Sequence, residues 1–278
     1  MHSRVSAGNR AVPVQPVLVI LAALLIVILA AAFIILYMLP HETGGEIFAW
    51  PINPRVSSMM LGATYLGGAY FFAVVLLSRK WQHVWLGLLP VSAFAGTLGI
   101  ATLLHWENFV HERLTFQIWA FLYFTVPLFL PVLWYRNQRL APGGAGWAME
   151  LEGALPSSSR WAFGALGVIQ TVAGLVLLVF PQLMIAVWPW TLSPLTARIM
   201  AAIFLLPGLT GLSMAYDGSW SSTRYLMQAQ AFTVILMLIA VVVARDDIAW
   251  AQPTSWLFAG GLSLTLLLIV YTYVAKKR

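Results

Sequence analysis

The sequence contains no cysteine and few charged residues. Cysteine is absent from all 278 residues, which excludes disulfides, thiolate metal sites and cysteine nucleophiles. Only 9% of the residues are charged, whereas 61% are hydrophobic. A soluble domain has about a quarter charged residues, so the charges in this chain cannot cover a water-facing surface of its size. The composition predicts an integral membrane protein.

Long apolar stretches take up most of the chain. Each is about 20 residues long, which is enough for a helix to cross a hydrocarbon core of about 30 Å. Backbone polar groups must be paired in lipid, so these stretches are predicted to be helices. The predicted fold class is all-α, a polytopic membrane protein with eight transmembrane helices. The predicted spans are residues 17–39, 55–77, 84–104, 116–135, 161–181, 195–216, 225–244 and 255–275.

The basic residues are unevenly divided between the two sides that eight alternating spans define. Eleven of the fifteen Lys and Arg residues fall on the side of the N-terminus and four on the other. Because basic loops stay in the cytoplasm, both termini are predicted to be cytoplasmic. This bias explains the net charge of +6 without nucleic-acid binding. Most tryptophans fall near predicted span ends, which is typical of an aromatic belt at the membrane surface.

A shift of 140 residues places the first four predicted spans on the last four. Trp50 and Pro54 then fall on Trp190 and Pro194. In both places the residue before the proline is Asn or Ser, a helix-capping type, and proline favours the first position of a helix. We interpret the shared pattern as a helix start, with each tryptophan anchoring the entering chain at the membrane surface.

The shift predicts two similar four-helix halves, residues 1–140 and 161–278. An even number of spans in each half makes both halves run in the same direction, so the predicted axis relating them lies along the membrane normal. Residues 141–160, rich in Gly, Pro and Ser, are predicted to form a cytoplasmic linker.

One stretch of the second half resembles a known motif. Residues 188–190 read Trp-Pro-Trp and residues 194–198 read Pro-Leu-Thr-Ala-Arg, which is similar to a motif of bacterial multi-pass membrane proteins. The first half has Val-Ser-Ser at residues 56–58, where the second has Thr-Ala-Arg. The resemblance implies a bacterial cytoplasmic membrane and carries no activity over.

Ionisable residues are missing from the centres of all predicted spans. Proton relays, ion-coupling sites and counter-ions in membranes depend on such residues, so the sequence argues against a pump or a proton-coupled transporter. A mid-membrane haem would also need an axial histidine, and no cofactor is predicted. The polar residues inside the spans are Gln170, Gln228 and Gln230, together with scattered Ser and Thr.

The densest polar stretch lies between the third and fourth predicted spans. It includes His105 and Glu107, which the 140-residue shift places on Arg245 and Asp247. Arg198, about one turn inside the sixth span, is predicted at the same depth. We name His105, Glu107, Arg198, Arg245 and Asp247 the outer cluster and treat it as the candidate site.

The outer cluster could also be a metal or catalytic site, or a solvated loop with no binding role. His105 and His111 are six residues apart, which places them about 120° apart on a helix, so a helix would not bring both to one metal ion. No nucleophile is specified near them, and neither catalytic nor metal-binding residues are predicted. The simplest interpretation is a solvated loop at the membrane surface.

The predicted function is non-catalytic: a membrane scaffold, an accessory subunit or a lipid-associated protein. The alternatives are an uncoupled small-solute permease with a pathway between the halves, and an enzyme or metal binder on the outer face. Small-residue pairs such as Ala63 and Gly67 favour close helix packing, within the bundle or beside a larger membrane complex. The expected partners are membrane lipids and such a complex. A through-going polar cavity would favour the permease.

Overall fold

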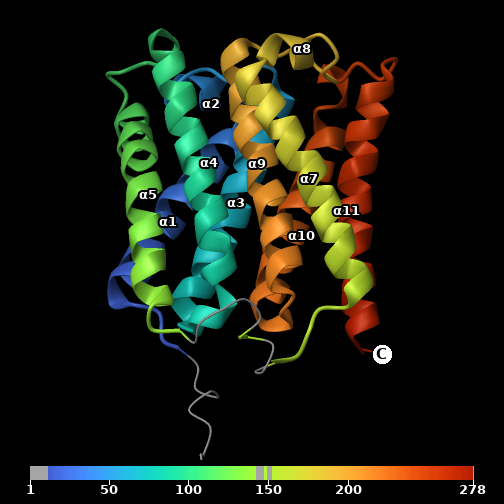
Figure 1. Ribbon diagram of the computed structural model, residues 1–278. Coiled ribbons are helices and arrows are strands. Elements are labelled where there is room, and N and C mark those ends of the chain that lie inside the picture. The colour runs from blue at the N-terminus through green and yellow to red at the C-terminus, as the bar shows by residue number, and fades with distance from the viewer. Residues whose placement is uncertain (1–11, 142–146, 149–151, 278) are drawn as a thin grey trace, which may run out of the picture.

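A computed structural model describes residues 12–141, 147, 148 and 152–277. Among these residues, eight helices are long and apolar enough to cross a membrane, which confirms the predicted all-α polytopic class (Figure 1). The helices are α1 (Pro16–Phe33, continued by a π-helix, Ile34–Met38), α3 (Arg55–Ser78), α4 (Trp85–Leu104), α5 (Leu114–Gln138), α7 (Ser157–Val179), α9 (Pro194–Asp217), α10 (Trp220–Val243) and α11 (Pro253–Lys277).

Two short helices, α2 (His41–Ile47) and α8 (Pro181–Ile185), were not predicted. Both lie at the end of the bundle opposite the start of α1 and the end of α11 (Figure 1). We call this end the far face, and the end with the start of α1 the terminal face. The predicted start of α10 at residue 225 is five residues late, because the first turn from Trp220 is polar but fully buried at Ser221 and Ser222.

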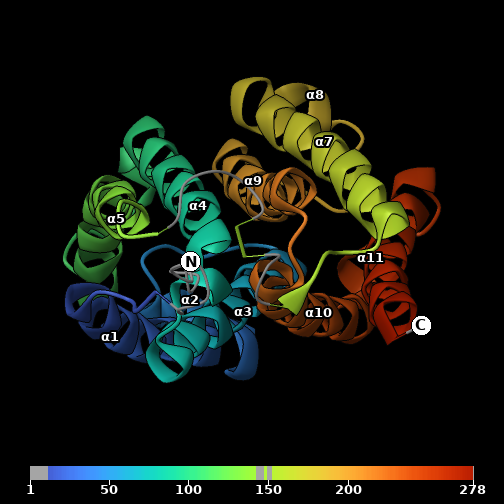
Figure 2. The ribbon, with the colours of Figure 1, turned by 60° about the horizontal axis from the view of Figure 1, so that its bottom comes forward.

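The eight helices stand in two rows of four, which Figure 2 shows from the terminal face. One row runs α1, α3, α10, α11 and the other runs α5, α4, α9, α7. Each row combines helices of both predicted halves, because α10 packs against α3 and α4 packs against α9. The four central helices therefore hold the two halves of the chain together.

Glycines allow α7 and α9 to pack closely. A Cβ atom built on Gly167 would lie 2.8 Å from the carbonyl oxygen of Gly208, and one built on Gly211 would lie 2.7 Å from that of Phe163. Only glycine permits backbones to approach to this extent, as in other membrane helix pairs. These small residues serve packing inside the bundle.

Similar hydrogen bonds close the terminal face in both halves. In the first half, Val14 N–H donates to the carbonyl oxygen of Arg79 at 3.0 Å. About 140 residues later, Leu155 N–H donates to that of Gly218 at 2.8 Å. Arg79 and Gly218 both adopt a left-handed conformation, with φ of 50° and 69°. In each half, the chain entering the first helix thus pairs with the turn after the second.

A second pair of matched bonds lies at the far face. Val110 N–H donates to the carbonyl oxygen of Ala49 at 2.9 Å, and Ala249 N–H donates to that of Pro189 at 2.8 Å. The loop after the third helix of each half is therefore fastened to the chain that leads into the second helix.

The prediction of a tryptophan belt is wrong for many of the tryptophans, which are buried inside the protein. Trp50 is 3% exposed and packs edge-on against Phe109 and Trp119, with ring centroids 4.9 and 4.8 Å away. Trp190 is also 3% exposed, and its indole N–H donates to Ser57 Oγ at 2.8 Å. Both side chains fasten the far-face loops to the bundle. The buried tryptophans are Trp50, Trp81, Trp85, Trp119, Trp147, Trp188 and Trp190.

Candidate functional site

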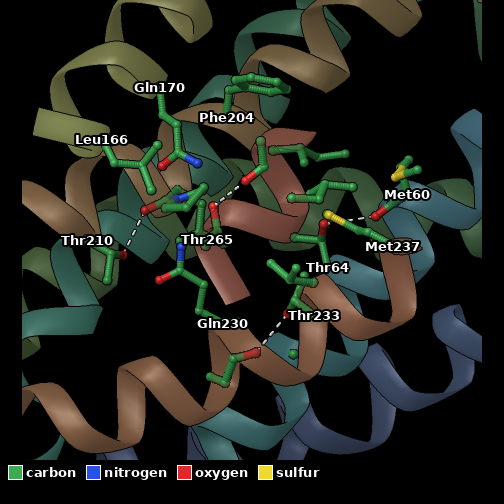
Figure 3. Close-up of a pocket in the computed structure, with 18 of the residues that line it drawn as sticks. Met60, Thr64, Leu166, Gln170, Phe204, Thr210, Gln230, Thr233, Met237 and Thr265 are labelled. Carbon is green, nitrogen blue, oxygen red and sulfur yellow. Dashed lines mark hydrogen bonds between the residues drawn. The ribbon is translucent and has the colours of Figure 1, made fainter. Parts of the chain in front are cut away.

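A cavity of about 280 Å³ lies inside the bundle, between the α7–α9 pair and the α10–α11 pair (Figure 3). Helices α3 and α4 close its inner side. No ionisable side chain is among the described residues that line it. The lining is almost entirely apolar, with side chains such as Met60, Phe204 and Met237, so the cavity suits a molecule that lipid dissolves better than water.

The cavity is hollow beside Gly261 of α11. A Cβ atom built on Gly261 would meet nothing within 4 Å, although Gly261 lines the cavity. Gly260, its neighbour in sequence, also faces open space but does not line the cavity. Gly261 therefore leaves room that any larger side chain would fill.

Two glutamine amides supply the free polar groups of the cavity. Gln170 from α7 and Gln230 from α10 enter it from opposite sides, with their amides directed inward (Figure 3). Neither side chain has a hydrogen-bond partner within the described part of the chain. In contrast, the hydroxyls of Thr210, Thr233 and Thr265 donate to carbonyl oxygens of their own helices at 2.7, 3.0 and 2.8 Å. The amide N–H groups are therefore the donors that remain for a ligand.

The cavity opens sideways between α7 and α11. Ile169 and Leu257 line it and are also 65% and 72% exposed on the outer surface of the bundle. The two helices meet near the terminal face, where Thr272 Oγ1 donates to Ser159 Oγ at 2.8 Å, and they separate toward the far face (Figure 1). The opening lies along the membrane-crossing length of both helices, so it faces the lipid.

The outer cluster separates into distinct contacts at the far face. Arg198 donates from Nη1 to Nε2 of His105 at 2.7 Å and from Nε to the carbonyl oxygen of Leu178, near the end of α7, at 3.1 Å. His105 accepts this bond as a neutral ring. Burial, and then the Arg198 guanidinium, lower the pKa of His105.

The other members of the outer cluster do not join this pair. Asp247 Oδ2 accepts a 2.9 Å hydrogen bond from the backbone N–H of Val56, in the first turn of α3. Arg245 lies 3.7 Å from its neighbour Asp246 at an exposed site. Glu107 is exposed. Within the described residues, Arg198 forms no ion pair with either Glu107 or Asp247, so the cluster does not converge on one ligand.

A charged contact at the terminal face was not predicted. Glu152 Oε2 lies 3.0 Å from Nη1 of Arg224, and Glu152 Oε1 lies 3.4 Å from Nε2 of His83. Burial and then Arg224 lower the pKa of His83, although Glu152 acts in the opposite direction. The contact joins the predicted linker to both halves. Nothing in the sequence signals it, because Glu152 lies in a stretch that reads only as a polar connector.

In the sequence, Gln170 and Gln230 are recognisable only as polar residues inside predicted spans. Both side chains reach the same cavity because of the way α7 and α10 pack, and the spacing of residues along the sequence does not predict this packing. A comparison of the chain with protein-family models, with curated proteins and with solved structures finds no match.

Proposed function

We propose that this is a non-catalytic, lipid-associated membrane protein that holds a neutral lipophilic molecule in the cavity between the α7–α9 and α10–α11 pairs. The observation that carries the proposal is an apolar cavity with an opening toward the lipid and two unused amides inside. A binding cavity normally combines an apolar lining with a few placed polar groups, and this one follows that pattern.

The cavity gives less support to a small-solute permease. A pathway for a polar solute needs hydrogen-bonding groups along its length to replace water. Here the threonine hydroxyls are engaged with their own helices, and the remaining polar groups are two amides among apolar side chains. A polar solute would lose most of its hydrogen bonds on entering.

The test is to ask whether the cavity holds a molecule that co-purifies with the protein. The protein is solubilised gently, and its bound lipophiles are extracted and identified by mass spectrometry. We expect a stoichiometric lipophile with the unaltered chain and its loss in Gly261→Phe, because the new ring occupies the cavity. The matched control is Gly260→Phe, which places the same ring outside the lining.

Two outcomes would contradict the proposal. One is equal retention of the lipophile by both phenylalanine variants, which would place it elsewhere on the protein. The other is the absence of any stoichiometric lipophile from the unaltered protein, even when candidate lipids are supplied during solubilisation.

The proposed location is the cytoplasmic membrane of a bacterium, with both termini in the cytoplasm. The division of eleven and four basic residues supports this orientation. The matched hydrogen bonds at both faces support two halves related by an axis along the membrane normal. A reporter fused after Lys80 should report cytoplasm, and one placed near Glu46 should report the opposite side. The reverse result would overturn the orientation.

A further inference from the structure

The arrangement of the two glutamines restricts the chemistry of the molecule in the cavity. Gln170 and Gln230 lie near the middle of their helices, where neither amide can reach water at a membrane surface. Burying an amide donor without a partner is unfavourable, so these side chains gain most from a ligand that supplies oxygen atoms. Two donors that enter from opposite sides match two acceptors on opposite edges of one group (Figure 3).

The other lining residues exclude whole classes of ligand. A phosphate or carboxylate head group would be buried without a counter-ion, because no cationic side chain is among the described lining residues. The volume of about 280 Å³ lies just below the usual range of ligand cavities, which is about 300 to 1,000 Å³. A single ring fits such a space, and a longer chain must leave through the opening between α7 and α11.

We propose that the cavity binds the ring of a quinone with a long apolar tail, with its two carbonyl oxygens accepting hydrogen bonds from Gln170 and Gln230 and its tail in the lipid. The inference rests on the proposed function, since it names the occupant of the same cavity. Binding requires no redox step, and none is proposed.

The experiment measures the binding of two matched ligands to the full-length protein in lipid nanodiscs by equilibrium dialysis. One ligand is a decyl-substituted benzoquinone and the other is decylbenzene, which has the same tail but no oxygen. We expect Gln170→Leu and Gln230→Leu each to weaken quinone binding by roughly three- to tenfold, the effect of losing one hydrogen bond. Decylbenzene should bind these variants no more weakly than the unaltered protein.

Gln228→Leu is the matched control, because Gln228 lies on α10 outside the cavity lining. Its Oε1 already accepts a 2.8 Å hydrogen bond from Tyr70 OH, and its replacement should leave the affinity for quinone unchanged. A second readout is tryptophan fluorescence. The ring centroid of Trp190 lies 5.1 Å from that of Phe258, a lining residue, so a bound quinone should quench part of the emission.

The outcomes separate this inference from the proposed function. Quinone binding that is unchanged in both glutamine variants, yet lost in Gly261→Phe, would overturn the hydrogen-bonding role and leave the cavity as a lipophile site. An equal loss of quinone and decylbenzene in the glutamine variants would show a packing role and would also overturn the inference. If neither ligand binds the unaltered protein but a stoichiometric lipophile still co-purifies and is lost in Gly261→Phe, the quinone inference fails and the proposed function stands; if no lipophile is retained either, both proposals fail.

Discussion

The two halves of the chain fill their interiors differently. In the first half, Tyr123 of α5 donates its hydroxyl to that of Tyr65 of α3 at 2.8 Å, and Phe94 of α4 packs edge-on against Tyr123. These rings occupy the space between the α1–α3 and α4–α5 pairs. In the second half, the matching space between the α7–α9 and α10–α11 pairs is the cavity. Comparable helix pairs therefore enclose a packed core in one half and a cavity in the other.

Side-chain size accounts for the difference. Leu122 on α5 is buried, and 139 residues later α11 has Gly261, which lines the cavity. Phe94 on α4 is 7% exposed, and the residue 139 positions later on α10 is Thr233, also in the lining. At these two positions the second half has a smaller side chain than the first.

The two glutamines of the cavity also belong to one half. Gln170 lies 141 residues after Leu29, and Gln230 lies 139 residues after Val91. Leu29 is 9% exposed and packs in the core of the first half. An amide in place of an apolar side chain adds nothing to core packing, so the comparison favours a binding role for both glutamines.

The largest expected effect on stability comes from a substitution that disrupts the packed core of the first half. Tyr123→Ala should lower the free energy of unfolding by about 3–5 kcal/mol, because it leaves a void and removes the hydroxyl bonded to Tyr65. Leu262→Ala, 139 residues later on α11, should lower it by only about 1 kcal/mol, because Leu262 already borders open space. Unfolding in mixed micelles measures both. Equal losses would show that the two interiors are packed alike.

The next effect concerns the attachment of one half to the other. Asp247 accepts the backbone N–H of Val56 at 2.9 Å, as a capping side chain does, although it comes from the opposite half. Asp247→Ala should therefore lower the free energy of unfolding by about 1 kcal/mol, typical of a lost helix cap. The adjacent Asp246 is 97% exposed, and Asp246→Ala should change stability by less than about 0.5 kcal/mol. Similar values for the two variants would contradict the capping role.

Much of the fold could be predicted from the sequence because long apolar stretches identify membrane helices. The predicted span 195–216 matches α9 closely. Ser193 caps this helix as expected, because its side chain accepts a hydrogen bond from the backbone N–H of Thr196 at 3.1 Å. The equivalent prediction for Asn53 is wrong: its side chain pairs with His41 at 2.9 Å instead, and Asp247 supplies the cap of α3. A capping residue type indicates a helix start but not the source of the hydrogen bond.

The site could not be predicted to the same extent. The outer cluster was inferred from residues at similar predicted depth, but depth does not fix rotation about the helix axis. Arg198 therefore reaches His105, whereas Asp247 turns to the start of α3. The cavity depends on which residues face one another across four helices. Small residues such as Gly261 are typical of tight helix packing, and only their three-dimensional surroundings show that this one borders open space.

An effect of similar size but opposite sign sharpens the comparison by filling the cavity. Gly261→Leu gives α11 the residue type that α5 has 139 positions earlier, and nothing within 4 Å obstructs the new Cβ. We expect the free energy of unfolding to rise by about 1 kcal/mol, from reduced flexibility of the unfolded chain and from new contacts. Gly260→Leu shares only the first contribution and should stabilise less. Equal gains in thermal unfolding would mean that leucine does not pack into the cavity.

The smallest effect concerns pH and again distinguishes the halves. Near the end of α7, the charged Arg198 donates to the carbonyl oxygen of Leu178 and to the neutral ring of His105. In the first half, 140 residues earlier, the uncharged Ser58 hydroxyl donates to the carbonyl oxygen of Leu36 at 2.7 Å. Burial and Arg198 hold the pKa of His105 below its ordinary value of 6.5. The folded protein therefore takes up this proton less readily than the unfolded chain, and stability is lost as the pH falls below 6.5.

His105→Gln should flatten this dependence, because glutamine can accept the Arg198 bond without titrating. The difference in the free energy of unfolding between the unaltered protein and His105→Gln should be constant above pH 6.5. As the pH falls further, this difference should shift in favour of the variant, by less than the effect of Asp247→Ala. His83, whose pKa is also lowered by burial and then by Arg224, contributes a dependence of the same sign to both proteins and cancels from the difference. Parallel stability profiles between pH 5 and pH 8 would show that protonation of His105 does not compete with the Arg198 contact.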